Sequence, residues 1–219
     1  EQRRKTVKKW IVLAVLAFGG YQLYERGYWP NFSEGAFDAE GNPIVRVFVG
    51  PGCGQRCAKV TTLLDRRNVD YERVDVSTPK GQDYGVRRYP LTMVGDREVL
   101  GDNSPHIVSA LAENFGDGML TRTERAAMRN HFADNGRPVV LMYGTNWCPY
   151  CKKQRAYFEE NGIEYYEIDA EKSAAGKLAY RVLRGGGYPL TYVGYRRFDG
   201  YKTDEILRAI RELDAQAGG

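Results

Sequence analysis

The chain has 219 residues, which is too many for one small domain and suits two domains of about 80–100 residues each. Hydrophobic residues make up 42% and charged residues 27%, which is typical of a folded soluble protein. The net charge of +4 is local, because residues 1–9 hold five cations and one anion and the remaining residues sum to zero. A neutral body lacks the basic face that nucleic-acid binding requires, so no nucleic acid is expected as a partner.

The basic start leads into an uncharged run from Trp10 to Tyr24 that includes WIVLAVLAF. As a helix these residues span about 22 Å, somewhat short of the roughly 30 Å hydrocarbon core of a bilayer. The alternative is a signal-peptide core, but no small-x-small cleavage site follows, which favours an uncleaved anchor within residues 1–29. The cations precede the apolar run, so the positive-inside rule predicts an inner-membrane anchor with periplasmic domains in a bacterium. Domains that face the cytoplasm are the alternative.

Two copies of one pattern follow a Pro/Gly/Asn-rich spacer at residues 30–42. A shift of 94 residues places PIVRVFVG on RPVVLMYG and NVDYERVDV on GIEYYEIDA. At a shift of 99 residues, YPLTMVG falls on YPLTYVG, so the second copy has five additional residues within SAAGKLAYRVLRGGG. This ordered series of matches predicts an internal duplication.

Each copy is expected to run strand, helix, strand, helix, strand, strand, helix, which predicts an α/β fold. The copies define domains at residues 43–116 and 137–217, joined by a linker at residues 117–136. Helices are predicted at residues 58–67, 104–114, 149–161 and 203–215, with a linker helix at 121–135. His106 and His131 are expected on the surfaces of two separate helices.

The stretch TNWCPYCKK places Cys148 directly after a strand and at the start of a helix. Unpaired N–H groups at a helix N-terminus favour negative charge, so Cys148 is the expected nucleophile, and Cys151 is placed to resolve a mixed disulfide. A zinc site needs a second pair of ligands, and the remaining cysteines and histidines lack suitable spacing, so no metal is expected. A structural disulfide with so short a loop would constrain the unfolded chain little. These comparisons favour a redox-active dithiol.

Trp147-Cys148-Pro149-Tyr150-Cys151 at the start of a helix, with Pro189 before a later strand, resembles the glutaredoxin family. The resemblance covers residues 137–216 well and 43–115 in outline. It implies two thioredoxin-fold domains, each a central mixed sheet flanked by helices, and a cis Pro189 beside the sulfurs. The implied activity is thiol–disulfide exchange on proteins or small disulfides, with no metal or prosthetic group. Electrons would come from glutathione or from a system like thioredoxin reductase.

The chain departs from the glutathione-using pattern at three places. Thr145 replaces a Lys, Gly187-Tyr188 replaces Thr-Val, and Gly200-Tyr201-Lys202-Thr203-Asp204 replaces Gly-Gly-x-Asp-Asp. Glutathione is therefore only a candidate co-substrate, with these candidate contacts: Thr145, Tyr150, Tyr188, Thr203 and Asp204. Thr203 and Asp204 also fit a simple helix N-cap.

The first copy carries GPGCGQRC, a pair of cysteines with a longer spacer. At a shift of 94 residues Gly54 falls on Cys148, whereas a slip of one residue places Cys53 there instead. Three interpretations stay open for Cys53 and Cys57: a regulatory or electron-relaying disulfide, a stabilising disulfide, or two unpaired thiols in a degenerate substrate-binding or docking domain. Pro90 corresponds to Pro189.

Two other classes of function compete with an oxidoreductase. One is a tandem binding or assembly module in which the dithiol is secondary. The other is a glutathione-dependent iron–sulfur carrier, which is disfavoured because such carriers typically present a single thiol, as in CGFS.

Overall fold

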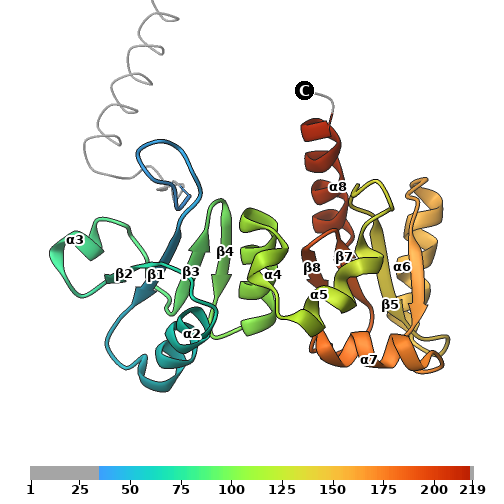
Figure 1. Ribbon diagram of the computed structural model, residues 1–219, viewed down its shortest axis with the longest axis horizontal. Coiled ribbons are helices and arrows are strands. Elements are labelled where there is room, and N and C mark those ends of the chain that lie inside the picture. The colour runs from blue at the N-terminus through green and yellow to red at the C-terminus, as the bar shows by residue number, and fades with distance from the viewer. Residues whose placement is uncertain (1–34, 218–219) are drawn as a thin grey trace, which may run out of the picture.

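The computed structural model describes residues 35–217 (Figure 1). The expected membrane anchor lies outside these residues and stays a prediction, as does the cellular location that follows from it. Within residues 35–217, no helix has the length and apolar character needed to cross a bilayer.

The N-terminal domain is built on a four-stranded sheet of order β2-β1-β3-β4, in which only β1 and β2 are parallel. Its strands are β1 (Val45–Val49), β2 (Glu72–Asp75), β3 (Leu91–Val94) and β4 (Arg97–Leu100). Its helices are α2 (Gly54–Arg66), α3 (Pro79–Gln82) and α4 (Ser104–Phe115). Alternate residues of β1 point to opposite faces, so Val45, Val47 and Val49 pack with α2 and α4, while Phe48 packs on the other face.

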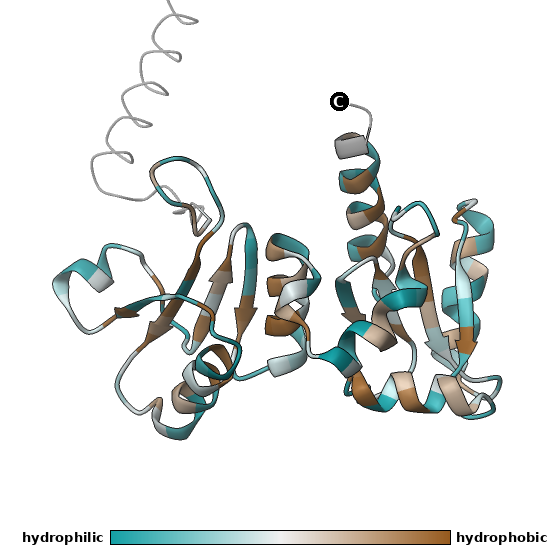
Figure 2. Cartoon of the chain, in the orientation of Figure 1, coloured by the Kyte–Doolittle hydropathy of each residue, from teal (hydrophilic) through white to brown (hydrophobic). Residues whose placement is uncertain are grey.

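The C-terminal domain repeats this topology, with order β6-β5-β7-β8. Its strands are β5 (Val140–Gly144), β6 (Tyr166–Asp169), β7 (Leu190–Val193) and β8 (Arg196–Asp199). Its helices are α6 (Pro149–Glu160), α7 (Ala174–Val182) and α8 (Thr203–Ala217). Brown, which marks hydrophobic residues, covers much of the central strands of both sheets (Figure 2). The predicted α/β fold with two mixed sheets flanked by helices is confirmed.

The strand registers show how the two copies correspond. The five additional residues of the second copy lie in α7, which has nine residues where α3 has four. The predicted shift of 94 residues is wrong for the first strand. Val45 pairs with Val94 as Val140 pairs with Val193, so Val140 is the equivalent of Val45, and these two residues are 95 positions apart. Asp75 and Asp169 remain 94 apart, so the first copy has one additional residue between its first two strands.

The linker is less helical than expected. It contains a 3-10 turn η1 (Asp117–Met119), helix α5 (Arg122–Met128) and a 3-10 turn η2 (Arg129–His131). Thr121 and Glu124 form a capping box that starts α5. The predicted helix at residues 121–135 ends early because residues 133–136 form a turn, in which Gly136 has φ 79° and its N–H donates to Ala133.

Helix α4 lies between the two sheets (Figure 1). Its residues Ile107, Ala110 and Leu111 belong to the N-terminal core. Val108 and Ala112, on another side of the helix, pack in the core of the C-terminal domain. One helix therefore contributes to two hydrophobic cores and holds the domains together.

Ser109 of α4 joins the domains by hydrogen bonds. Its buried hydroxyl donates to the Tyr195 carbonyl and accepts from the Arg197 N–H at 3.1 Å. We expect Ser109→Ala to lower the free energy of unfolding by about 1–3 kcal/mol, because a buried donor and acceptor lose their partner. Urea unfolding would measure this, with Ser104→Ala of the same helix as the matched control. Equal midpoints for the two variants would show that Ser109 contributes nothing.

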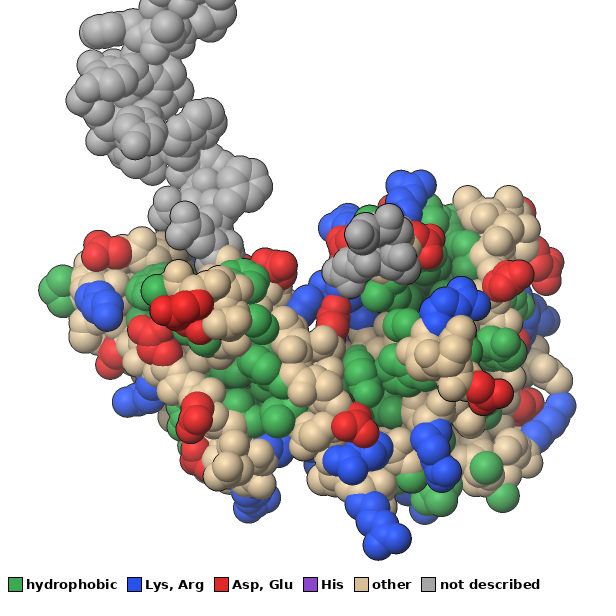
Figure 3. All heavy atoms as spheres, turned by 45° about the horizontal axis from the view of Figure 1, so that its top comes forward, with side chains coloured by type: hydrophobic (Ala, Val, Ile, Leu, Met, Phe, Trp, Pro, Cys, Tyr) green, Lys and Arg blue, Asp and Glu red, His purple; other side chains and the backbone are tan. Residues whose placement is uncertain are grey.

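On the face shown in Figure 3, acidic and basic groups are interspersed over both domains. The arrangement on that face agrees with the neutral charge balance outside residues 1–9.

Candidate active site

The geometry of Cys148 and Cys151 follows from the start of α6. Cys148 is the N-cap residue, with extended backbone, and Pro149 occupies the first turn, where its missing N–H costs nothing. The Cys151 N–H donates to the Cys148 Sγ at 3.0 Å. Both thiols are free and buried, at 3% and 0% exposure. The helix start thus holds the Cys148 sulfur where a backbone donor stabilises negative charge.

Gly144, the last residue of β5, lets the helix approach the strand. A Cβ at Gly144 would lie 3.4 Å from the Cys151 Sγ and 2.7 Å from the Glu167 Oε1. An added methyl group would therefore require the flexible end of the Glu167 side chain to move and would touch the Cys151 sulfur.

Burial raises the pKa of the Cys151 thiol to about 12, and two further causes are the hydrogen bond and the negative charge of Cys148. A backbone hydrogen bond from Thr145 and the charge of Arg155 act in the opposite direction. The Cys151 thiol is therefore held in its protonated form.

Arg155 supports the dithiol and was not singled out from the sequence. Its guanidinium makes two hydrogen bonds to Glu167 of β6, at 2.7 and 2.8 Å, and a third to the Thr145 carbonyl at 3.1 Å. These contacts tie α6 to the loop before Cys148. The available signal was helical spacing, since Arg155 lies four residues after Cys151 and so shares its side of the helix.

The Tyr188–Pro189 turn lies against the cysteine loop. Both Tyr–Pro bonds, at Pro189 and at Pro90, are cis, as the resemblance implies. The Tyr188 ring packs edge-on to Trp147, with centroids 6.0 Å apart, and stacks with Tyr180 at 4.9 Å. Trp147 immediately precedes Cys148, so this contact brings the two predicted parts of the site together.

Two aromatic side chains stand out from the surface beside the buried thiols. Trp147 is 64% exposed and its indole N–H donates to Glu171 at 2.9 Å. Tyr150 is 55% exposed, with the Lys153 ammonium 5.6 Å from its ring centroid. A partner that reaches Cys148 would therefore meet aromatic surface first.

The other candidate glutathione contacts are placed differently from one another. Thr145 is 1% exposed, and its hydroxyl has no hydrogen-bond partner. Thr203 and Asp204 open α8, after a turn whose Gly200 N–H donates to the Pro189 carbonyl at 2.8 Å. Of the five, only Tyr150 and Tyr188 belong to the group of aromatic side chains beside the two cysteines. Contacts with glutathione at the other three residues stay predictions.

Cys53 and Cys57 form a disulfide, with Cα atoms 5.5 Å apart. This excludes the interpretation as two unpaired thiols. The register of β1 and β5 places Cys53 at the position of Cys148, so the slip of one residue considered from the sequence is the correct alignment. The additional residue of the first copy lies before its second strand, which accommodates the longer CxxxC spacer.

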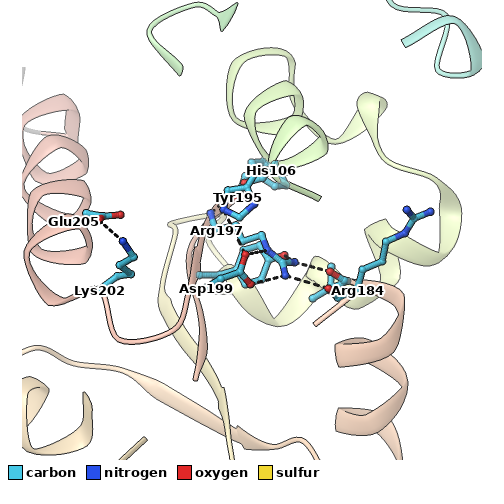
Figure 4. A network of polar contacts seen from close by, with 10 residues as sticks. His106, Arg184, Tyr195, Arg197, Asp199, Lys202 and Glu205 are labelled. Carbon is cyan, nitrogen blue, oxygen red and sulfur yellow. Dashed lines mark hydrogen bonds and ion pairs between the residues drawn. The ribbon is translucent and has the colours of Figure 1, made fainter. Parts of the chain in front are cut away.

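Neither histidine is a simple surface residue, contrary to expectation. His131 is fully buried and bonds to the Gly194 carbonyl and the Tyr143 hydroxyl. His106 is half-buried where α4 meets β8, and its Nε2 lies 3.4 Å from Asp199 (Figure 4). Both were misplaced because each packs against a segment far away in sequence. Among residues 35–217 no group of three or more His, Cys, Asp or Glu side chains is arranged to hold a metal ion.

Comparison with known proteins adds to this geometry. Residues 140–189 match the glutaredoxin family. A Pseudomonas aeruginosa glutaredoxin is 29% identical over 80 residues, which are 36% of this chain and 94% of that protein. The segment that matches the family includes Cys148, Cys151 and Pro189.

Two solved glutaredoxin structures also align. The Archaeoglobus fulgidus protein has 26% identity and a TM-score of 0.29, covering 33% of this chain and 85% of that chain. The Methanosarcina mazei Go1 protein has 20% identity and a TM-score of 0.30, covering 36% and 96%.

Proposed function

We propose that the chain is a thiol–disulfide oxidoreductase that acts through Cys148 and Cys151. The observation that carries this proposal is the asymmetry of the two thiols at the start of α6. The Cys148 sulfur accepts a backbone hydrogen bond, whereas the Cys151 thiol is held protonated by burial and by its neighbour. The glutaredoxin match at residues 140–189 agrees with this chemistry.

The exchange would proceed in two steps. The Cys148 thiolate attacks one sulfur of a substrate disulfide, and the other sulfur leaves as a thiolate that takes a proton from water. Cys151 then loses its proton and attacks the Cys148 sulfur, which releases the second substrate thiol and forms the Cys148–Cys151 disulfide. Two electrons pass to the substrate. An external thiol such as glutathione, or a reductase, would restore the dithiol, and no metal or prosthetic group is needed.

Trapping the mixed disulfide tests this proposal. In a Cys53→Ser/Cys57→Ser background, Cys151→Ser treated with hydroxyethyl disulfide should accumulate an adduct on Cys148 that dithiothreitol removes. Cys148→Ser should accumulate little on Cys151, because that thiol is buried and has a raised pKa. Mass spectrometry of the quenched proteins measures both. Equal adducts on the two variants, or none on either, would contradict the proposal.

A partner-binding module remains the alternative, and the exposed aromatic rings beside the thiols are the observation in its favour. The same variants separate the two. Binding of a protein client would survive Cys148→Ser, whereas exchange would not.

A further inference from the structure

The Cys53–Cys57 disulfide stands where the C-terminal domain has its dithiol, at the start of the first helix of its domain. The two cysteines differ in burial: Cys53 is buried, with 7% of its surface exposed, whereas Cys57 is only partly buried. In the C-terminal domain both cysteines are buried. Cys57, the second cysteine of the pair, is thus the less covered residue, and exchange is faster at a sulfur that is easier to reach.

On the Pro90 side, the protein's own groups cover the disulfide loop. The Tyr89 hydroxyl donates to the Pro51 carbonyl at 3.2 Å, and the ring lies where a Cβ on Gly50 would be 2.7 Å from its Cζ. Arg56 donates to the Tyr89 carbonyl at 3.4 Å. The equivalent Tyr188 instead packs on Trp147 and Tyr180. The backbone carbonyl before Pro90 is thus already hydrogen-bonded to a side chain of the same domain.

The opposite side is open. A groove of about 440 Å³ runs between α2 and β2, and its lining includes both cysteines, Ala58 and Thr61 of α2, and Arg73 and Asp75 of β2. Its volume lies in the range of small-molecule sites, about 300–1,000 Å³. Arg73 offers a cation for a carboxylate, and Asp75, whose pKa is lowered mainly by hydrogen bonds from Ser77, stays ionised and can meet an ammonium group.

We propose that the Cys53–Cys57 disulfide is a second exchange centre, which oxidises a small peptidic thiol that enters through this groove and attacks Cys57. The thiolate sulfur bonds to the Cys57 sulfur while the bond to Cys53 breaks. Cys53 leaves as a thiolate at the N-terminus of the 13-residue helix α2, where the helix dipole favours negative charge, and takes a proton from water. A second thiol then attacks the bound one, releasing a peptidic disulfide and the Cys57 thiolate. Two electrons have moved from two thiols to the protein.

In this centre the second cysteine, Cys57, exchanges with the substrate and the first, Cys53, is the leaving group. In the C-terminal domain it is the first cysteine, Cys148, that exchanges with the substrate. The inference does not depend on the function proposed for Cys148 and Cys151. Full-length Cys148→Ser/Cys151→Ser protein isolates it, just as Cys53→Ser/Cys57→Ser isolates the other site, so failure of one proposal is distinguishable from failure of the other.

The first experiment treats that Cys148→Ser/Cys151→Ser protein with reduced glutathione under native conditions, followed by acid quenching, alkylation and peptide mass spectrometry. We expect a glutathione adduct on Cys57 and alkylation on Cys53. An adduct on Cys53 would overturn the assignment of the attacked sulfur. A disulfide that is reduced only after denaturant is added would show that it is purely stabilising and overturn the proposal as a whole.

Two matched substitutions test the route. Ala58→Trp places a large ring in the groove and should slow reduction at least about tenfold, because exchange rates depend on access to the sulfur. Gln55→Trp adds the same ring at an exposed position of the same helix outside the groove lining, and should change the rate less than about twofold. Equal effects of the two would argue against entry through the groove.

The substrate class is tested separately. Arg73→Gln should slow reduction by glutathione and leave reduction by mercaptoethanol, which has no carboxylate, unchanged. No change with glutathione would overturn the assignment of a carboxylate-bearing thiol.

Discussion

Replacing Arg197 by methionine is expected to lower the free energy of unfolding by about 1–3 kcal/mol, the usual cost of leaving buried hydrogen-bonding groups without their partner. The Arg197 side chain is almost fully buried, and its guanidinium bonds to Asp199 at 2.6 and 3.0 Å (Figure 4). It also donates to the carbonyls of Leu183 and Arg184, at 2.5 and 3.2 Å, where α7 ends. These carbonyls lack partners inside the helix, so Arg197 acts as its C-terminal cap.

Urea unfolding of the full chain measures this effect. Lys202→Met is the matched control, because Lys202 forms only an exposed pair with Glu205 and its loss should cost less than about 1 kcal/mol. The substitution at Arg197 should also loosen residues 183–189, which lead from α7 to Pro189. Similar stabilities for the two variants would show that Arg197 is not needed as the cap.

His131 is expected to make the fold sensitive to acid. Its Nδ1 contacts the Gly194 carbonyl at 3.2 Å and its Nε2 contacts the Tyr143 hydroxyl at 3.0 Å, so the neutral ring can satisfy both groups. The ring also packs against Tyr192, with centroids 4.5 Å apart. Burial lowers the pKa of His131 from 6.5 to about 4, although the Gly194 carbonyl acts slightly in the other direction.

The sign of the pH effect follows from proton binding. Between about pH 4 and 6.5 the unfolded chain binds a proton at His131 and the folded chain does not, so stability falls as the pH is lowered through this window. The loss between pH 7.5 and 4.5 should reach about 2–3 kcal/mol from this group alone. Carboxylates also make the free energy of unfolding depend on pH. The measured quantity is therefore the difference between the wild type and His131→Gln in the slope of this free energy against pH, because the glutamine side chain does not titrate. Parallel slopes would rule out His131 as the cause.

Much of the architecture could be predicted because the repeated motifs are local. YPLT-x-VG marks the same turn and strand in both copies, and CPYC sits at a helix start that proline and backbone geometry make recognisable. The five-residue difference between copies was also visible. The offset of one residue at the first strand was not visible, because PIVRVFVG and RPVVLMYG are both mostly apolar runs that fit one another at either offset. Only the pairing of Val45 with Val94 sets the register.

The missed features depend on contacts between distant residues. Ser109 of the first copy bonds to Tyr195 and Arg197 of the second, about 90 positions away, and no periodic pattern predicts such a pair. Arg196 likewise pairs with Glu113 across the domains. His131 looked like a surface residue because its short helix is polar, yet the strand ends of the C-terminal domain enclose it.

The place of α4 between the sheets has a further consequence, for solubility. β4 and β8 are edge strands, and an exposed edge is a template on which another chain can add a strand and begin to aggregate. Ser109 occupies an N–H and a carbonyl of the β8 segment, and α4 contacts β4 as well as β8. Helix α4 therefore obstructs the addition of a strand at the β8 edge, a protection that the C-terminal domain would lose if it were separated from α4.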